Sequence, residues 1–225
     1  MTAIPARSRG SVQGFGNAGA NAARILDEAG YKIIAASDSK GGIYCKDGII
    51  PMKAIQCKME KGSIHECTVA DKKVDYHVSK GTHCERVTNE DLLEMDCDLL
   101  ILSALEAQIT EKNAPKIKAK MILELANGPI TAEADEILEK RGIEIIPDIL
   151  ANAGGVTVSY FELVQNQMNY YWPKEEIQER LKVIMVNAWN RVRENQRTYN
   201  CTLRTAAFVT ALKRLGEMLK LRGIV

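Results

Sequence analysis

The sequence predicts an α/β protein with a doubly wound, mostly parallel sheet followed by C-terminal helices. Three observations predict this fold: a glycine-rich turn near the start of the chain, strand and helix patterns that alternate up to about residue 150, and helical periodicity over about residues 152–223. Strands that are apolar along their whole length are typical of a parallel sheet covered on both faces. We therefore expect a single domain over residues 1–225, with its sheet-based core at about 11–150.

The first element is a turn in "SVQGFGNAGANAARI", where Gly14, Gly16 and Gly19 form the pattern G-x-G-x-x-G. Only Val12 is clearly apolar before this turn, so we expect the preceding strand to be short or poorly formed. Apolar residues then recur at helical spacing over 22–29, and the apolar run "YKIIAAS" over 31–37 predicts a buried strand. The order strand, glycine turn, helix and strand is typical of a Rossmann-like βαβ unit.

This βαβ context predicts a dinucleotide site. The glycines allow a tight turn and close approach of a pyrophosphate, which the N-terminus of the following helix attracts. We therefore expect cofactor contacts from six consecutive residues: Gly14, Phe15, Gly16, Asn17, Ala18 and Gly19. Asp38 ends the next strand, about 20 residues beyond the turn, where a carboxylate binds the adenosine ribose. Ser39, with Ser37 and Lys40, could instead receive a 2′-phosphate, so NAD and NADP both remain open.

The α/β alternation continues after residue 96. Strand-like segments begin at Cys97 ("CDLLILSA"), Lys120 ("KMILELA") and Ile143 ("IEIIPDI"), separated by a helical turn over 110–117 and a helix over 131–142. Helices are expected over 152–169, from Pro173 to about Gln196, and over 203–223. The polar segment Cys45–Arg86 has no clear period, so we expect an extended connection with a short helix near Met52–Met59 and a hairpin or loop beyond it.

Six scattered cysteines without a C-x-x-C pair predict free thiols rather than a disulfide framework. We expect no metal. A rival zinc site would use His65, Cys67, His83 and Cys84, although their spacing matches no zinc motif.

Charge and hydropathy exclude other classes of function. The formal net charge is +1, which predicts no nucleic-acid partner. No apolar run is long enough to span a bilayer, and the N-terminus lacks the apolar core of a secretory signal, so we expect a cytoplasmic protein without membrane contact.

Five segments together resemble the coenzyme-binding domain of the glutamate dehydrogenases: "SVQGFGNAG", "SDSKGGIY", "LELANGP", "PDILANAGGVTVSYFE" and "LRTAAFVTALKRL". The resemblance implies an NAD(P)-dependent oxidoreductase that deaminates L-glutamate to 2-oxoglutarate. It also implies that Asn127 and Asn152 contact the nicotinamide end of the cofactor and that Ser159 contacts the substrate carboxylate. A domain like that of leucine or phenylalanine dehydrogenase is an alternative, although "ANGP" and Ser159 favour glutamate.

The sequence departs from this family in several places. The resemblance implies a preceding substrate domain with an acid–base lysine and aspartate, which is absent here, so we expect no catalytic residue in this chain and no activity without a separate substrate-domain subunit. A homo-oligomer is also possible in this family. Four residues replace those usual in the family: Leu102, Ala107, Leu125 and Leu163. They keep open a second function, that of a non-catalytic nucleotide-binding or regulatory interaction module.

Overall fold

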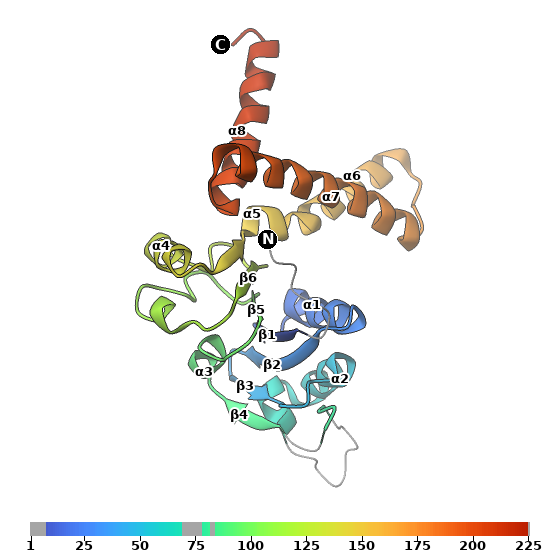
Figure 1. Ribbon diagram of the computed structural model, residues 1–225. Coiled ribbons are helices and arrows are strands. Elements are labelled where there is room, and N and C mark those ends of the chain that lie inside the picture. The colour runs from blue at the N-terminus through green and yellow to red at the C-terminus, as the bar shows by residue number, and fades with distance from the viewer. Residues whose placement is uncertain (1–7, 69–77, 82–83, 225) are drawn as a thin grey trace. The chain divides into compact units, whose positions relative to one another are not determined.

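The computed structural model describes residues 8–68, 78–81 and 84–224, which form two compact units (Figure 1). The first unit spans Met1–Glu144 and the second Ile145–Val225. The first contains strands with the helices that accompany them, the second is mainly helical, and the last strand, Glu144–Ile146, spans the division between the two in the sequence. Each unit is described by itself below.

The sheet has the strand order β4-β3-β2-β1-β5-β6-β7. Its strands are β1 (Arg9–Gln13), β2 (Lys32–Asp38), β3 (Gly41–Tyr44), β4 (Glu85–Val87), β5 (Leu99–Leu102), β6 (Met121–Glu124) and β7 (Glu144–Ile146). β1 pairs in parallel with β2 on one side and β5 on the other, and β5 pairs in parallel with β6. β3 is antiparallel to both β2 and β4. The predicted α/β class with a mostly parallel sheet is confirmed.

Helices connect these strands, and local capping explains where several of them begin. They are α1 (Asn17–Glu28), α2 (Pro51–Lys61), α3 (Asn89–Leu93) and α4 (Ala132–Lys140), with the 3-10 segments η1 (Ile64–Thr68) and η2 (Ala114–Lys116). The Thr88 side chain accepts a hydrogen bond from the Asp91 N–H, and the Asp91 carboxylate accepts one from the Thr88 N–H, which forms a capping box at α3. α2 starts at a proline and ends at Gly62, whose φ of 76° is left-handed.

The expectation of a poorly formed first strand is wrong. β1 is a five-residue strand at the centre of the sheet. Ser11 and Val12 are fully buried, and Gln13 is only 2% exposed. The side chains of β1 give a weak strand signal because three of them, Arg9, Ser11 and Gln13, are polar. The strand is stabilised instead by backbone ladders on both sides, and Gln13 Nε2 donates to Gln108 Oε1 at 2.7 Å.

In the described part of the segment Cys45–Arg86, which excludes residues 69–77 and 82–83, helices and a strand replace the expected extended connection. The expected hairpin or loop lies largely outside the described residues. The described part contains α2 and η1, and it ends at β4, which pairs with β3 through Gly42↔Val87, Ile43↔Arg86 and Tyr44↔Glu85. The predicted short helix near Met52–Met59 is present as α2. The sequence missed the antiparallel edge because its partners lie far apart in the chain and neither strand has an alternating apolar pattern.

The expectation of free thiols is wrong for four of the six cysteines. Disulfides join Cys45 to Cys84 and Cys57 to Cys67, with Cα–Cα separations of 4.3 and 6.1 Å. The first bridge follows from the ladder, because Cys45 and Cys84 are the next residues in register after the Tyr44↔Glu85 pair. Cys97, which is buried, and Cys201 are free.

The second unit contains α5 (Asp148–Ala151), α6 (Ala153–Met168), α7 (Lys174–Tyr199) and α8 (Leu203–Leu221), which confirms the three predicted C-terminal helices. Its core consists of five buried residues: Leu150, Val192, Leu203, Ala206 and Ala207. Asn200 ends α7 in a left-handed conformation, and the Thr202 side chain caps α8 by accepting from the Thr205 N–H. Within the described ranges, no helix combines the length and apolar character that a membrane crossing requires.

Ala107 offers a test of the loop that follows β5. Its φ is 50°, a left-handed conformation that is costly for alanine and easier for asparagine. We predict that Ala107→Asn raises the free energy of unfolding by about 0.5–1 kcal/mol, measured by urea denaturation. Ala104→Asn, at an exposed position in the same loop, is the control and should change stability by less than about 0.5 kcal/mol. Equal effects of the two substitutions would contradict the assignment of strain.

Candidate dinucleotide-binding site

In the first unit, the loops that follow the parallel strands lie at one edge of the sheet. Because β1, β2, β5 and β6 are parallel, their carboxyl ends meet there. The chain crosses from β1 to β2 on one side and reaches β5 on the other, so the strand order reverses at β1. Such a reversal is where doubly wound sheets bind ligands. The sequence-predicted residues 14–19, Ser39 and Asn127 follow strands that end at this edge, and Asp38 is the last residue of β2.

The glycine turn is held by backbone contacts on both sides. The N–H groups of Gly14 and Phe15 donate to the Ser37 carbonyl oxygen at 3.0 and 2.6 Å. On the other side, the Ser103 hydroxyl donates to the carbonyl oxygen of Gly14 at 2.7 Å. A Cβ on Gly14 would lie 2.5 Å from the backbone nitrogen of Ala104, and the φ of Gly14 is 91°. Only glycine suits this position.

In contrast to the crowded Gly14, the first turn of α1 is open to solvent. Gly16 is the N-cap residue, no side chain caps this helix, and nothing described lies within 4 Å of a Cβ built on Gly16. Gly16, Asn17 and Ala18 are exposed, whereas Phe15 and Gly19 are buried. The N-terminal amides of a helix lack intrahelical acceptors and carry a partial positive charge. This turn can therefore accept an anionic group such as a pyrophosphate.

Asp38 lies beside the turn and is held by several donors. Its Oδ1 accepts from the Lys40 N–H at 3.0 Å and from the Ser63 hydroxyl at 2.9 Å. Its Oδ2 accepts from the Ile64 N–H at 2.8 Å and lies 3.5 Å from the Lys58 ammonium. Lys58 also donates to the Phe15 carbonyl oxygen at 2.7 Å. Lys58 therefore links the predicted ribose carboxylate to the predicted phosphate turn.

These contacts decide the ionisation of Asp38. Burial alone would raise the pKa of this carboxyl, because its side chain is only 9% exposed. The N–H groups of Lys40 and Ile64, the Ser63 hydroxyl and the Lys58 charge act in the opposite direction and outweigh burial. The net result is a lowered pKa, so Asp38 is a carboxylate at neutral pH.

Sequence reasoning missed Lys58, Ser63 and Ile64. They lie 20 or more residues beyond Asp38: Lys58 is on α2, Ser63 immediately precedes η1 and Ile64 begins it, and no local motif marks them. The sequence indicates His65 only as a candidate metal ligand. Its ring instead packs against the turn after Asp38, because a Cβ on Gly41 would lie 2.6 Å from His65 Nδ1.

The alternative zinc site lacks the two free thiols that it requires. Cys67 and Cys84 belong to two different disulfides, so neither supplies a thiolate ligand. His83 lies outside the described residues. Among the residues that are described, no group of three His, Cys, Asp or Glu side chains could hold a metal ion.

The remaining predicted residues lie on different elements. Asn127 is exposed in the loop after β6, where Leu125 and Ala126 donate to the Leu102 carbonyl oxygen. In the second unit, Asn152 is the half-buried residue between α5 and α6, and Ser159 is exposed on α6.

Two of the departures from the family resemblance have clear environments. Leu102 is fully buried in β5, where it is part of the apolar core. Leu163 is 52% exposed on α6.

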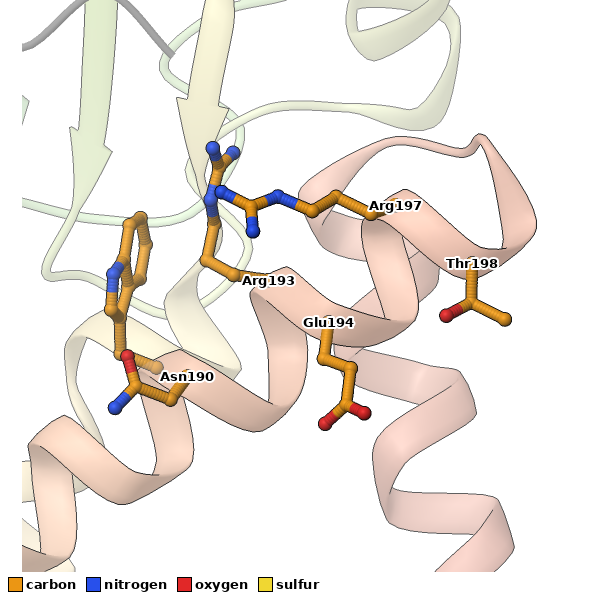
Figure 2. A pocket seen from close by; sticks show the side chains of 6 residues that line it. Asn190, Arg193, Glu194, Arg197 and Thr198 are labelled. Atoms are coloured by element: carbon orange, nitrogen blue, oxygen red, sulfur yellow. The ribbon is translucent and has the colours of Figure 1, made fainter.

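A separate pocket of about 370 Å³ lies along α7 (Figure 2). Trp189, Asn190, Arg193, Glu194, Arg197 and Thr198 line it. Arg193 and Arg197 extend toward each other, whereas Glu194 points away from them (Figure 2). Every lining residue lies in the second unit, whereas the glycine turn belongs to the first.

Comparison with known proteins decides the family. The model of the Glutamate/Leucine/Phenylalanine/Valine dehydrogenase family matches residues 4–223. The chain belongs to this family. It is 46% identical over 98% of its length to a glutamate dehydrogenase of Thermotoga maritima, covering 50% of that protein. A catabolic NAD-specific glutamate dehydrogenase of Bacillus subtilis is 41% identical (95% of this chain, 47% of that protein), and an NADP-specific one of Synechocystis is 44% identical (97% and 50%).

Solved structures agree with this assignment. The hetero-hexameric glutamate dehydrogenase of Thermus thermophilus, in a leucine-bound form, superposes with a TM-score of 0.84 at 26% identity. The match covers 99% of this chain and 50% of the Thermus chain. The chain thus spans about half the length of the relatives that it matches.

The crowding at Gly14 predicts unequal effects of alanine within the same turn. Gly14→Ala should lower the free energy of unfolding by at least about 2 kcal/mol, because its Cβ has no space and its φ is left-handed. Gly16→Ala should cost about 1 kcal/mol or less, because a Cβ there meets nothing within 4 Å. Urea denaturation of both variants provides the measurement, and equal losses would show that the turn is not held as described.

The lowered pKa of Asp38 predicts a pH-dependent contribution to stability. At pH 7, Asp38→Asn should reduce the free energy of unfolding by about 1.5–3 kcal/mol. A neutral amide replaces the carboxylate, so the charge-assisted hydrogen bonds are lost. A carboxyl with a lowered folded pKa stabilises the protein above its unfolded pKa of about 3.9, and the contribution is lost as pH falls through the folded value. The difference between variant and parent should therefore shrink below about pH 4. A difference that is equal at pH 7 and pH 3 would contradict this.

Proposed function

We propose that this chain binds NAD(P) at the glycine turn and serves as the coenzyme-binding part of an oxidoreductase that acts on the amino group of L-glutamate. The observation that carries the proposal is the open N-terminus of α1 at Gly16, next to the crowded and buried Gly14. The close backbone contacts of Gly14 fix the shape of the turn, and the open space beside Gly16 leaves room for a pyrophosphate. The residues present therefore fit a dinucleotide.

In this proposal each part of the edge has its own role. The amides at the start of α1 bind the pyrophosphate, Asp38 and Ser39 lie at the adenosine ribose, and Asn127 orients the nicotinamide end. The bound dinucleotide supplies hydride transfer. The residues of this chain bind and orient the dinucleotide.

The choice between NAD and NADP depends on the surroundings of Asp38. A carboxylate favours the free ribose hydroxyls, whereas the nearby Lys58 and Lys40 supply positive charge for a 2′-phosphate. The names of the relatives include both NAD-specific and NADP-specific enzymes. We propose that either dinucleotide can enter this site.

We propose glutamate as the substrate because the similar proteins are named glutamate dehydrogenases and because Ser159 offers an exposed hydroxyl on α6. The family resemblance assigns the acid–base lysine and aspartate to a substrate domain outside these 225 residues. For these residues alone we therefore expect dinucleotide binding without glutamate turnover. A subunit or domain that carries those groups would complete the reaction, and an oligomer is compatible with the hetero-hexameric relative.

A valine at Gly16 tests the proposed phosphate contact without disturbing the fold. The position is exposed and extended, with φ −85° and ψ −161°, so a β-branched residue fits the backbone. Its side chain would occupy the space of the pyrophosphate. We predict that Gly16→Val weakens NADH and NADPH binding by at least about tenfold, equivalent to about 1.4 kcal/mol, measured by fluorescence titration of the purified chain.

Gly216→Val is the matched control, since Gly216 on α8 also has nothing within 4 Å of an added Cβ. It should bind as the parent does. Absence of binding by the parent at millimolar concentrations of both dinucleotides would refute the proposed function. Glutamate-dependent reduction of NAD or NADP by the chain alone would refute only the expectation that it needs a substrate domain.

A further inference from the structure

The carboxylate of Asp38 is almost fully occupied by donors from its own chain. Lys40 and Ser63 donate to Oδ1, Ile64 donates to Oδ2, and the Lys58 ammonium lies 3.5 Å from Oδ2. A carboxylate offers about four acceptor positions. In this arrangement, little acceptor capacity remains for the two hydroxyls of an unphosphorylated ribose.

The Cys57–Cys67 disulfide encloses three of these four donors. Lys58, Ser63 and Ile64 lie between the two bridged cysteines, which are separated by 10 residues. The bridge fastens η1 to α2, and Cys67 Sγ lies 3.5 Å from the Ser63 carbonyl oxygen. The short segment that supplies the Ser63 and Ile64 donors is therefore held in place by a covalent bond as well as by its hydrogen bonds.

Building on the proposed dinucleotide site, we infer that Cys57 and Cys67 form a redox-sensitive pair whose oxidation state sets the preference of the site between NADP and NAD. With the bridge closed, Asp38 is occupied and its charge is offset by Lys58, so a 2′-phosphate meets little repulsion. With the bridge open, η1 is released and Asp38 regains acceptor positions for the 2′- and 3′-hydroxyls. Closing the bridge favours NADP, and opening it favours NAD.

Opening the bridge is a two-electron thiol–disulfide exchange with a dithiol reductant. One thiolate of the reductant attacks a bridge sulfur, which forms a mixed disulfide and releases the other cysteine as a thiolate. The second thiolate of the reductant then displaces the remaining cysteine. Both cysteines take up a proton, and the reductant becomes a disulfide.

Attack on the bridge requires local opening, because Cys57 is 1% and Cys67 is 5% exposed. The element that must open is η1, a 3-10 segment of five residues. Such short segments have poorer hydrogen-bond geometry than α-helices and belong to the less stable parts of a fold. Reduction therefore requires no unfolding of the sheet.

The Cys45–Cys84 disulfide provides an internal comparison. Its cysteines continue the β3–β4 ladder, in which Tyr44 already pairs with Glu85. The ladder holds the two strands together without a covalent bond. Opening this second bridge should leave the donors of Asp38 in place.

The test compares four forms of the full chain: the oxidised parent, the dithiol-reduced parent, Cys57→Ser/Cys67→Ser, and Cys45→Ser/Cys84→Ser. Dissociation constants for NADH and NADPH are measured by fluorescence titration, and exchange of the Ile64 amide proton is measured by NMR. We expect the first double variant to shift the affinity ratio about tenfold toward NADH and to speed Ile64 exchange at least about tenfold. The second double variant should change neither quantity.

The dithiol-reduced parent, with its thiols counted by mass spectrometry, provides a second route to the open state.

The inference is overturned if both dinucleotides bind and the affinity ratio is the same in the open and closed forms. It is also overturned if Ile64 exchange is unchanged when the Cys57–Cys67 bridge is absent, a result that does not depend on dinucleotide binding. Failure of the oxidised parent and of both variants to bind either dinucleotide would refute the proposed function, and the inference with it. Equal shifts in both double variants would show general loosening and would likewise contradict the specific role of Cys57–Cys67.

Discussion

The close approach of Gly14 to the backbone of Ser103 and Ala104 is the constraint on which the rest of the site depends. A Cβ at Gly14 would lie 2.5 Å from these backbone atoms, and the Ser103 hydroxyl donates to the Gly14 carbonyl oxygen. This contact draws the loop after β5 against the turn after β1, while Ser37 holds the turn from the side of β2. The start of α1 is thereby fixed at the point where the strand order reverses, and its residues Gly16, Asn17 and Ala18 are exposed.

The second constraint is the charge of Asp38. A carboxylate that is 9% exposed needs donors, and it obtains them from Lys40, Ser63 and Ile64, with Lys58 nearby. The same Lys58 donates to the carbonyl oxygen of Phe15, so the phosphate turn and the ribose carboxylate share one cation. The described residues of α2 and η1 with Ser63 are therefore part of the proposed cofactor site, and the Cys57–Cys67 disulfide joins these two elements.

Local patterns predicted the glycine turn, the α/β alternation and the C-terminal helices, because glycine geometry and apolar periodicity act over a few residues. They failed where the stabilising interactions are long-range. β1 contains the buried polar residues Ser11 and Gln13 and depends on its neighbours in the ladder. The pairing of Cys45 with Cys84 depends on an antiparallel register that only the folded chain brings together. Lys58 reaches Asp38 from a separate helix, and no motif in the sequence indicated it.

The most direct test of the proposed cofactor site is a map of backbone amide chemical shifts in ¹⁵N-labelled chain titrated with NAD and NADP. A dinucleotide at the β1–β2–β5 edge should perturb the amides of residues 14–19 and those around Asp38 most strongly. Amides along the α7 pocket, from Trp189 to Thr198, should move far less. Perturbations centred on that pocket, with residues 14–19 unchanged, would contradict the central claim that the glycine turn holds the cofactor.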